Sequence, residues 1–238
     1  MAGRGRSAMN IFTDLFQSSL GKKFIMAVSG FVLCLFVLGH LAGNLQIFLG
    51  PEAINRYGHF LQSNPELIWP SRLVLLVLVG LHLWAAVKLS VENKAARPVA
   101  YARYEPLGST YASRTMLMSG LIILVFVVYH ILHFTVQVKS VNLTGQNFLE
   151  LTDREKRHDI FKMMVLGFSN GWVSGFYILG MALLCLHLSH GVSAMFQSLG
   201  FKNRNWKPLI DGFAKFIAIV LLVGYCSIPI AVLTGLVK

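Results

Sequence analysis

Four histidines lie within four different apolar segments of the chain: His40, His82, His130 and His190. An ionisable side chain at membrane depth is energetically costly and usually functional. Imidazole is also a common axial ligand of haem iron. Four imidazoles on four segments can form two ligand pairs, and this predicts two haem sites.

Two of these histidines belong to an internal repeat. Residues 29–40, SGFVLCLFVLGH, have a counterpart in residues 119–130, SGLIILVFVVYH, and Phe36 and Phe126 occupy matching positions. Each copy begins with a Ser-Gly step about 16 Å along the same helix face from its histidine. The step indicates either room for a macrocycle or close helix packing, which small residues commonly permit in membranes.

Composition sets the fold class that must position these histidines. The chain of 238 residues is 55% hydrophobic and only 13% charged. Its apolar segments reach the roughly 20 residues that a helix needs to cross a bilayer. We therefore expect an all-α, polytopic membrane protein in which a single domain of five transmembrane helices includes four ligand-bearing ones. The predicted spans are approximately residues 24–48, 71–90, 115–138, 171–196 and 210–237.

The segments between the spans are expected to be connections. Residues 1–19 are basic and then amphipathic, which predicts an interfacial helix. Residues 51–70 contain turn formers, among them Pro70, and residues 139–162 form a mixed-charge loop. Pro229 predicts a kink in the fifth span that neighbouring helices can accommodate.

Charge and cysteine content exclude other classes. The net charge of +11 comes from basic residues at the ends of apolar segments, so membrane topology explains it better than nucleic-acid binding does. Cys34, Cys185 and Cys226 lie within spans, and none belongs to a C-x-x-C-H motif. Any haem must therefore be held non-covalently.

Lysine and arginine are more numerous on the side that includes the N-terminus. The positive-inside rule therefore predicts a cytoplasmic N-terminus. With that topology, depth pairs His40 with His130 near the outer side and His82 with His190 near the inner side. The two levels are separated by about 12 Å at 1.5 Å per residue. His133 and His187 lie three residues from His130 and His190 and remain alternative ligands.

The ordered set of motifs resembles the five-helix dihaem cytochrome b anchor of succinate:quinone oxidoreductases and fumarate reductases. The resemblance covers the repeat, the His82-Leu83-Trp84 stretch and HLSHGVSAMFQSLG at residues 187–200. It implies that His40 and His130 hold the distal b-type haem. It also implies that His82 and His190, the histidine before glycine, hold the haem nearer the iron–sulfur subunit.

The resemblance also implies a function and partners. The chain would anchor the flavoprotein and iron–sulfur subunits to the bacterial inner membrane and relay electrons to quinone, with menaquinone the usual acceptor. It would contribute no catalytic residue for succinate oxidation. The iron–sulfur subunit is expected to dock on the cytoplasmic face, which includes Lys202, Arg204 and Lys207.

Some questions stay open at the level of sequence. Some fumarate reductases have an acidic residue where this chain has Leu188, so Glu66, His59 and Arg72 become candidates for proton handling at a quinone site. The electron flow could also run toward fumarate. The alternative functions are a cytochrome b subunit of a formate dehydrogenase or hydrogenase, and a transporter with a histidine relay.

Overall fold

The computed structural model of the chain describes residues 11–96 and 110–238. The first half of the predicted interfacial helix lies outside the described residues, as does most of residues 91–113, the polar connection expected between the second and third spans.

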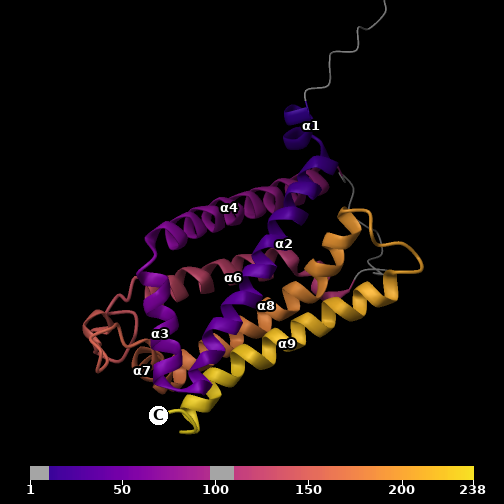
Figure 1. Cartoon of the computed structure of the whole chain (residues 1–238). Coiled ribbons are helices and arrows are strands. Elements are labelled where there is room, and N and C mark those ends of the chain that lie inside the picture. The colour runs from indigo at the N-terminus through magenta and orange to yellow at the C-terminus, as the bar shows by residue number, and fades with distance from the viewer. Residues whose placement is uncertain (1–10, 97–109) are drawn as a thin grey trace, which may run out of the picture.

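Long helices dominate the described residues and confirm the all-α prediction (Figure 1). The five longest are α2 (Ser19–Asn44), α4 (Pro65–Ala95), α6 (Met116–His130), α8 (Gly171–Ser198) and α9 (Lys207–Leu233). The 3₁₀ turn η1 (Leu45–Leu49) follows α2, and the π-helical turn η2 (Ile131–Thr135) follows α6. Within the described ranges, β pairing is limited to an isolated bridge between Thr152 and His158.

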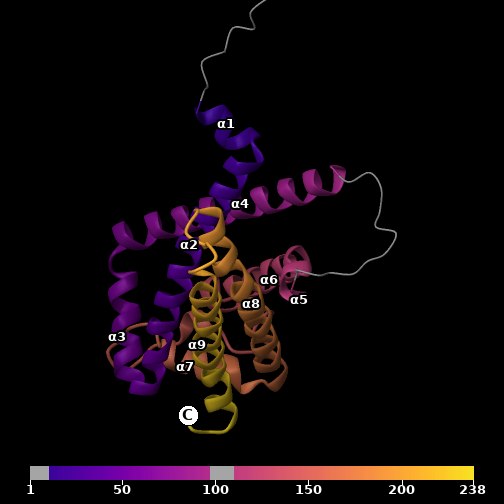
Figure 2. The ribbon, with the colours of Figure 1, turned by 90° about the vertical axis from the view of Figure 1, so that its right-hand side faces the viewer.

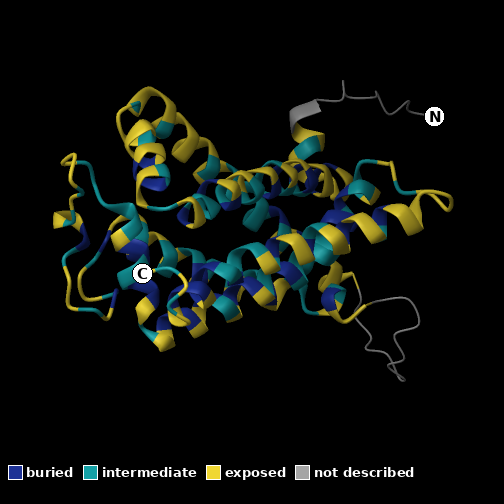
Figure 3. Ribbon diagram, turned by 60° about the horizontal axis from the view of Figure 1, so that its bottom comes forward, coloured by how far each residue is buried: buried dark blue, intermediate teal, exposed yellow. Residues whose placement is uncertain are grey.

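The same five segments are long and apolar enough to cross a membrane. Only 11% to 39% of the most hydropathic window of each is buried inside the protein, and large side chains such as Leu76, Val125 and Val223 are exposed (Figure 3). Water would penalise so much exposed apolar surface, whereas lipid does not. The chain is a multi-pass membrane protein.

Shorter helices gather at the ends of the bundle. The helices α3 (Pro51–Gln62) and α7 (Ile160–Ser169) lie at one end with the C-terminus, whereas α1 (Ile11–Gln17) lies at the opposite end (Figures 1 and 2). We call these the α3/α7 end and the α1 end. The remaining short elements are α5 (Tyr111–Arg114) and the 3₁₀ turn η3 (Phe148–Glu150).

Two predicted connections are more helical than expected. Residues 51–70 contain α3 and the start of α4, and Pro51 and Pro65 each begin a helix. Proline is favoured there because the first helical N–H groups need no intrahelical partner. Pro70 lies inside α4 and does not end it. The loop at residues 139–162 stops at Asp159, whose side chain accepts from the Lys162 N–H and caps α7.

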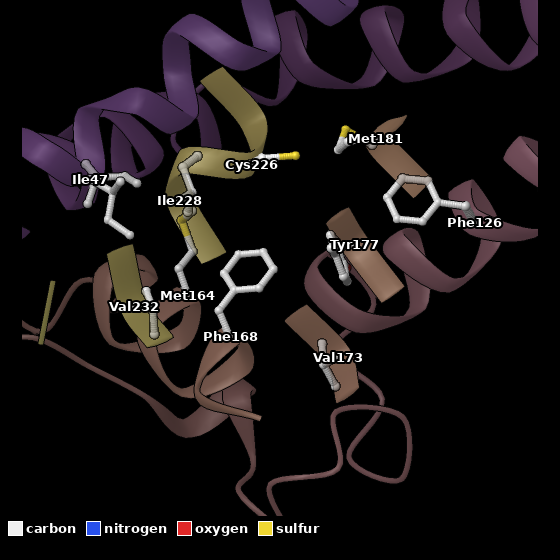
Figure 4. Close-up of a cluster of buried hydrophobic side chains, with 11 residues drawn as sticks. Ile47, Phe126, Met164, Phe168, Val173, Tyr177, Met181, Cys226, Ile228 and Val232 are labelled. Atoms are coloured by element: carbon white, nitrogen blue, oxygen red, sulfur yellow. The ribbon is translucent and has the colours of Figure 1, made fainter. Parts of the chain in front are cut away.

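Helix α8 is the centre of the packing. It contacts α2, α6 and α9, and α2 contacts α4 on its other side. At the α3/α7 end, Tyr177 and Met181 of α8 lie between Phe126 of α6 and Cys226 of α9 (Figure 4). The contacts of α8 and α2 thus connect all five long helices.

Candidate functional site

His40 and His130 come together near the α3/α7 end. Their ring centroids are 5.7 Å apart and the rings are nearly perpendicular. Each ring stacks on the phenylalanine one turn earlier in its own helix, Phe36 at 5.4 Å and Phe126 at 6.2 Å. The two copies of the sequence repeat therefore have the same local structure and direct their histidines at one another.

The ring of His130 has a hydrogen-bond partner on a neighbouring helix. Its Nδ1 atom lies 3.3 Å from the hydroxyl of Tyr177 on α8. His40 instead packs beside the ring of Tyr225 on α9, with centroids 6.3 Å apart. Helices α8 and α9 thus support a pair of histidines that α2 and α6 provide.

His82 lies against the Ser-Gly step of the first repeat. Its Nδ1 atom is 3.2 Å from the Ser29 hydroxyl and 3.2 Å from the backbone carbonyl of Met26. A carbonyl only accepts, so the Nδ1–H tautomer of His82 donates to Met26. The Nε2 atom is then unprotonated, which is the form that binds a metal.

His187 occupies the equivalent place in the second repeat. Its Nδ1 atom is 3.2 Å from the Ser119 hydroxyl. It also lies close enough to His82 for the two rings to interact electrostatically. The charged groups that act on His190 are instead Lys202 and Asp211.

The structure places His187, and not His190, against the Ser-Gly step of the second repeat, and His187 also interacts electrostatically with His82. The pairing of His82 with His190 stays a prediction, and His187 is the alternative ligand that this geometry favours. The stretch HLSHG offers two histidines three residues apart, which lie on nearly the same helix face. Sequence reasoning chose His190 because it precedes glycine, but the contact with Ser119 comes from another helix and has no local signal.

The glycines of the Ser-Gly steps provide space for imidazole rings. A Cβ atom at Gly30 would lie 3.0 Å from Cε1 of His82, and one at Gly120 would lie 3.5 Å from Cε1 of His187. Each Ser-Gly step therefore contacts an imidazole ring directly. The sequence had suggested two other roles for the step, room for a macrocycle and close helix packing.

The two histidine pairs lie at different levels of the bundle. His82 contacts α2 at Ser29 and Gly30, whereas His40 lies ten residues further along the same helix. At 1.5 Å per residue the levels are about 15 Å apart, compared with the 12 Å expected from sequence. This separation is too large for one metal cluster and suits two stacked cofactors.

The donor set fits haem better than a bare metal ion. The described residues contain no group of three or more histidine, cysteine or acidic side chains that could hold a metal. Each pair offers two imidazoles, and two imidazoles would suit a haem, whose porphyrin supplies the remaining ligands of the iron.

The other residues singled out by sequence lie elsewhere. His59, Glu66 and Arg72 are exposed, and Arg72 packs over the ring of Trp69 at 5.2 Å. They do not join the histidine pairs. Sequence reasoning missed Tyr177, which no motif marks.

Lys202 is not a free docking residue. Its ammonium donates to Asp211 at 2.6 Å and to Ser193 at 2.6 Å, and its side chain is only 14% exposed. Arg204 and Lys207 are exposed. In the connection between α8 and α9, these two are the predicted docking residues that are exposed, and docking itself stays a prediction.

Comparisons with protein-family models, curated proteins and solved structures find no match.

Proposed function

We propose that this protein is the membrane-anchoring dihaem cytochrome b subunit of a succinate:quinone oxidoreductase. The observation that supports this most is the presence of two imidazole pairs on four membrane helices at two levels. The resemblance described for the sequence supplies the enzyme class. The chain would relay electrons between the iron–sulfur subunit and quinone, in the direction of succinate oxidation or of fumarate reduction.

His40 and His130 would hold one b-type haem, and His82 and His187 the other. Haem iron with two imidazole ligands has no open position and supplies one-electron transfer. Non-covalent attachment agrees with Cys34, Cys185 and Cys226, which are buried and free.

The protein's own hydrogen bonds would orient three of the four ligands. Met26 and Ser29 contact Nδ1 of His82, Ser119 contacts Nδ1 of His187, and Tyr177 contacts Nδ1 of His130. A ligand whose second nitrogen is fixed in this way keeps its tautomer and ring orientation. The polar contacts thus leave Nε2 of these three rings for iron.

The two ends of the bundle would face different partners. We infer that the α1 end lies at the cytoplasmic side of a bacterial inner membrane and docks the iron–sulfur subunit, with the flavoprotein beyond it. Arg204 and Lys207, in the connection between α8 and α9, are exposed basic residues at that end. The α3/α7 end would face the opposite side, where the level of His40 and His130 is nearest and where menaquinone would exchange electrons.

Purification of the complex tests this function. The protein is expressed with its native partners, and haem is counted as the pyridine haemochrome and examined by electron paramagnetic resonance. We expect two low-spin haems per chain, both reducible by succinate, together with copurifying flavin and iron–sulfur clusters. A chain that holds no haem would refute the function, and two haems reduced by formate or hydrogen but not by succinate would favour another oxidoreductase.

A further inference from the structure

A buried polar chain continues outward from His130 at the α3/α7 end. His133 is three residues further along, in the π-helical turn, and is fully buried. Its Nδ1 atom lies 3.0 Å from the same Tyr177 hydroxyl that contacts His130. Tyr177 is thus the junction between two histidines on α6 and η2, and it projects from α8 into the core between helices (Figure 4).

Two atoms of this series of buried polar side chains lack hydrogen-bond partners. Among buried side-chain nitrogen and oxygen atoms of the described residues, only Nε2 of His133 and Oε1 of Gln137 have no hydrogen bond. An unsatisfied buried polar atom costs about 1–3 kcal/mol and needs an explanation. The two atoms belong to residues four positions apart, and one can be a donor while the other is an acceptor.

The tautomers make the two atoms complementary. If His130 offers Nε2 to iron, its Nδ1–H donates to the oxygen of Tyr177. The single Tyr177 hydroxyl proton must then be donated to Nδ1 of His133. His133 therefore has its own proton on Nε2, which is the unpartnered donor, and Oε1 of Gln137 is the unpartnered acceptor.

The chain continues beyond Gln137 to the surface loop. The amide Nε2 of Gln137 donates to Nε2 of His158 at 3.1 Å. The ring proton of neutral His158 is then on Nδ1, and the backbone of Leu151 is a hydrogen-bond partner of this ring. Every link thus donates in the same direction, away from His130.

The backbone at Gln137 has an unusual conformation for a residue with a side chain. Gln137 has φ +60°, a left-handed conformation that follows a helix end and usually belongs to glycine. A residue with a Cβ pays a conformational cost there, and such strain concentrates where the surroundings fix the residue. Glycine would relieve the strain but would remove the amide that links η2 to His158.

The surroundings of His133 leave no protein partner for Nε2. The ring packs against Phe134 at 4.0 Å, Tyr129 at 5.5 Å and Phe148 at 5.8 Å. Its Cε1 edge lies against Gly167 of α7, where an added Cβ would come within 3.2 Å. Buried waters typically satisfy such polar atoms in an otherwise apolar environment.

We propose that one buried water bridges Nε2–H of His133 and Oε1 of Gln137, and that it completes a hydrogen-bonded relay from His130 through Tyr177, His133 and Gln137 to His158. The relay rests on the proposed function, because its direction follows from ligation by His130. It positions the His130 ring and makes Tyr177 a better acceptor, since hydrogen bonds in a chain polarise one another. The resulting increase in ligand basicity stabilises the oxidised iron and lowers the midpoint potential of that haem.

The test is a graded set of variants in the complete complex: Tyr177→Phe, His133→Phe, Gln137→Leu and His158→Phe. We expect the midpoint potential of the His40/His130 haem to rise in every variant, most for the first and least for the last. The haem of the other pair is the internal control, and its potential should stay unchanged. A haem that is retained with an unshifted potential in both His133→Phe and Gln137→Leu would overturn the relay.

A second measurement does not depend on redox activity. Nitrogen nuclear magnetic resonance of protein labelled in histidine gives the tautomer of His133, with the signal assigned by its loss in His133→Phe. We expect the neutral Nε2–H form, and the Nδ1–H form would overturn the proposal. A preparation with no haem would refute the proposed function, whereas two haems together with an Nδ1–H His133 would refute only the relay.

Discussion

The Ser-Gly step of the first repeat should be sensitive to a single added methyl group. In Gly30→Ala the new Cβ would lie 3.0 Å from Cε1 of His82, where ordinary contacts begin at 3.4 Å. The ring must therefore retreat by about 0.4 Å. The 3.2 Å contact between Ser29 and His82 would lengthen to about 3.6 Å, at which no hydrogen bond remains.

The expected loss is modest and specific. One hydrogen bond contributes about 0.5–1.5 kcal/mol, which corresponds to a roughly twofold to twelvefold weaker hold on the haem between His82 and His187. Alanine is a better helix former than glycine by about 1 kcal/mol, so α2 itself should not be destabilised. Haem retention and thermal stability should thus change in opposite directions.

The assay is haem titration of the purified protein after partial extraction of the cofactor, with thermal unfolding in parallel. Gly120→Ala is the matched control, because its Cβ would lie 3.5 Å from His187, an ordinary contact distance. We expect Gly120→Ala to retain haem like the unmodified protein. An equal loss of haem in both variants, or a larger loss in Gly120→Ala, would refute the proposed role of these glycines in leaving space for the imidazole rings.

Three further outcomes are expected. Ser119→Ala should weaken haem retention by about tenfold. Ser29→Ala should weaken it less, because the Met26 carbonyl still accepts a hydrogen bond from His82. Competition with a haem-binding apoprotein measures both losses, and equal losses would contradict this prediction. Lys202→Met should lower the unfolding temperature by about 2–4 °C with haem content unchanged, since it breaks an ion pair in which the lysine is largely buried and Asp211 is partly exposed. An unchanged temperature would contradict that role. The hydrogen bond from Arg157 lowers the pKa of Glu52. The stability that this bond contributes is therefore present above the unfolded pKa of about 4.3 and is lost as pH falls through the folded pKa. Hydrogen exchange in residues 150–160 should increase at acid pH, and the increase should be smaller in Glu52→Gln.

The spans and one histidine pair follow from the sequence because they depend on local patterns. Hydropathy locates all five helices, and the repeat predicts that His40 and His130 are equivalent. The matching phenylalanines Phe36 and Phe126 stack on these rings as their common register suggests. Hydrophobic segments and repeated spacings within one helix can be recognised in the sequence without knowing which helices pack together.

The second pair could not be fixed in this way. His187 and His190 are about 4.5 Å apart along one helix, a difference too small for depth arguments to separate. The observation that distinguishes them is the contact of Ser119 with His187, and Ser119 is distant in sequence and meets His187 only after α6 packs on α8. Tyr177 likewise becomes a partner of His130 and His133 through that packing alone.

The sequence does not predict the short helices at the α3/α7 end, for another reason. Prolines and polar residues in residues 51–70 indicate turns, but Pro51 and Pro65 stand at helix starts, where proline is tolerated. Helix α7 has only ten residues and cannot span a membrane, so hydropathy gives it little weight.

The number of haems per chain in two ligand variants tests the central claim most directly. The pyridine haemochrome is measured for the unmodified protein, for His187→Ala and for His190→Ala, each purified with its partners. We predict two, one and two haems, respectively, because His187 contacts Ser119 and interacts electrostatically with His82, whereas the charged groups that act on His190 are Lys202 and Asp211. One haem in His190→Ala with two in His187→Ala would contradict the pairing, and no haem in the unmodified protein would contradict the function.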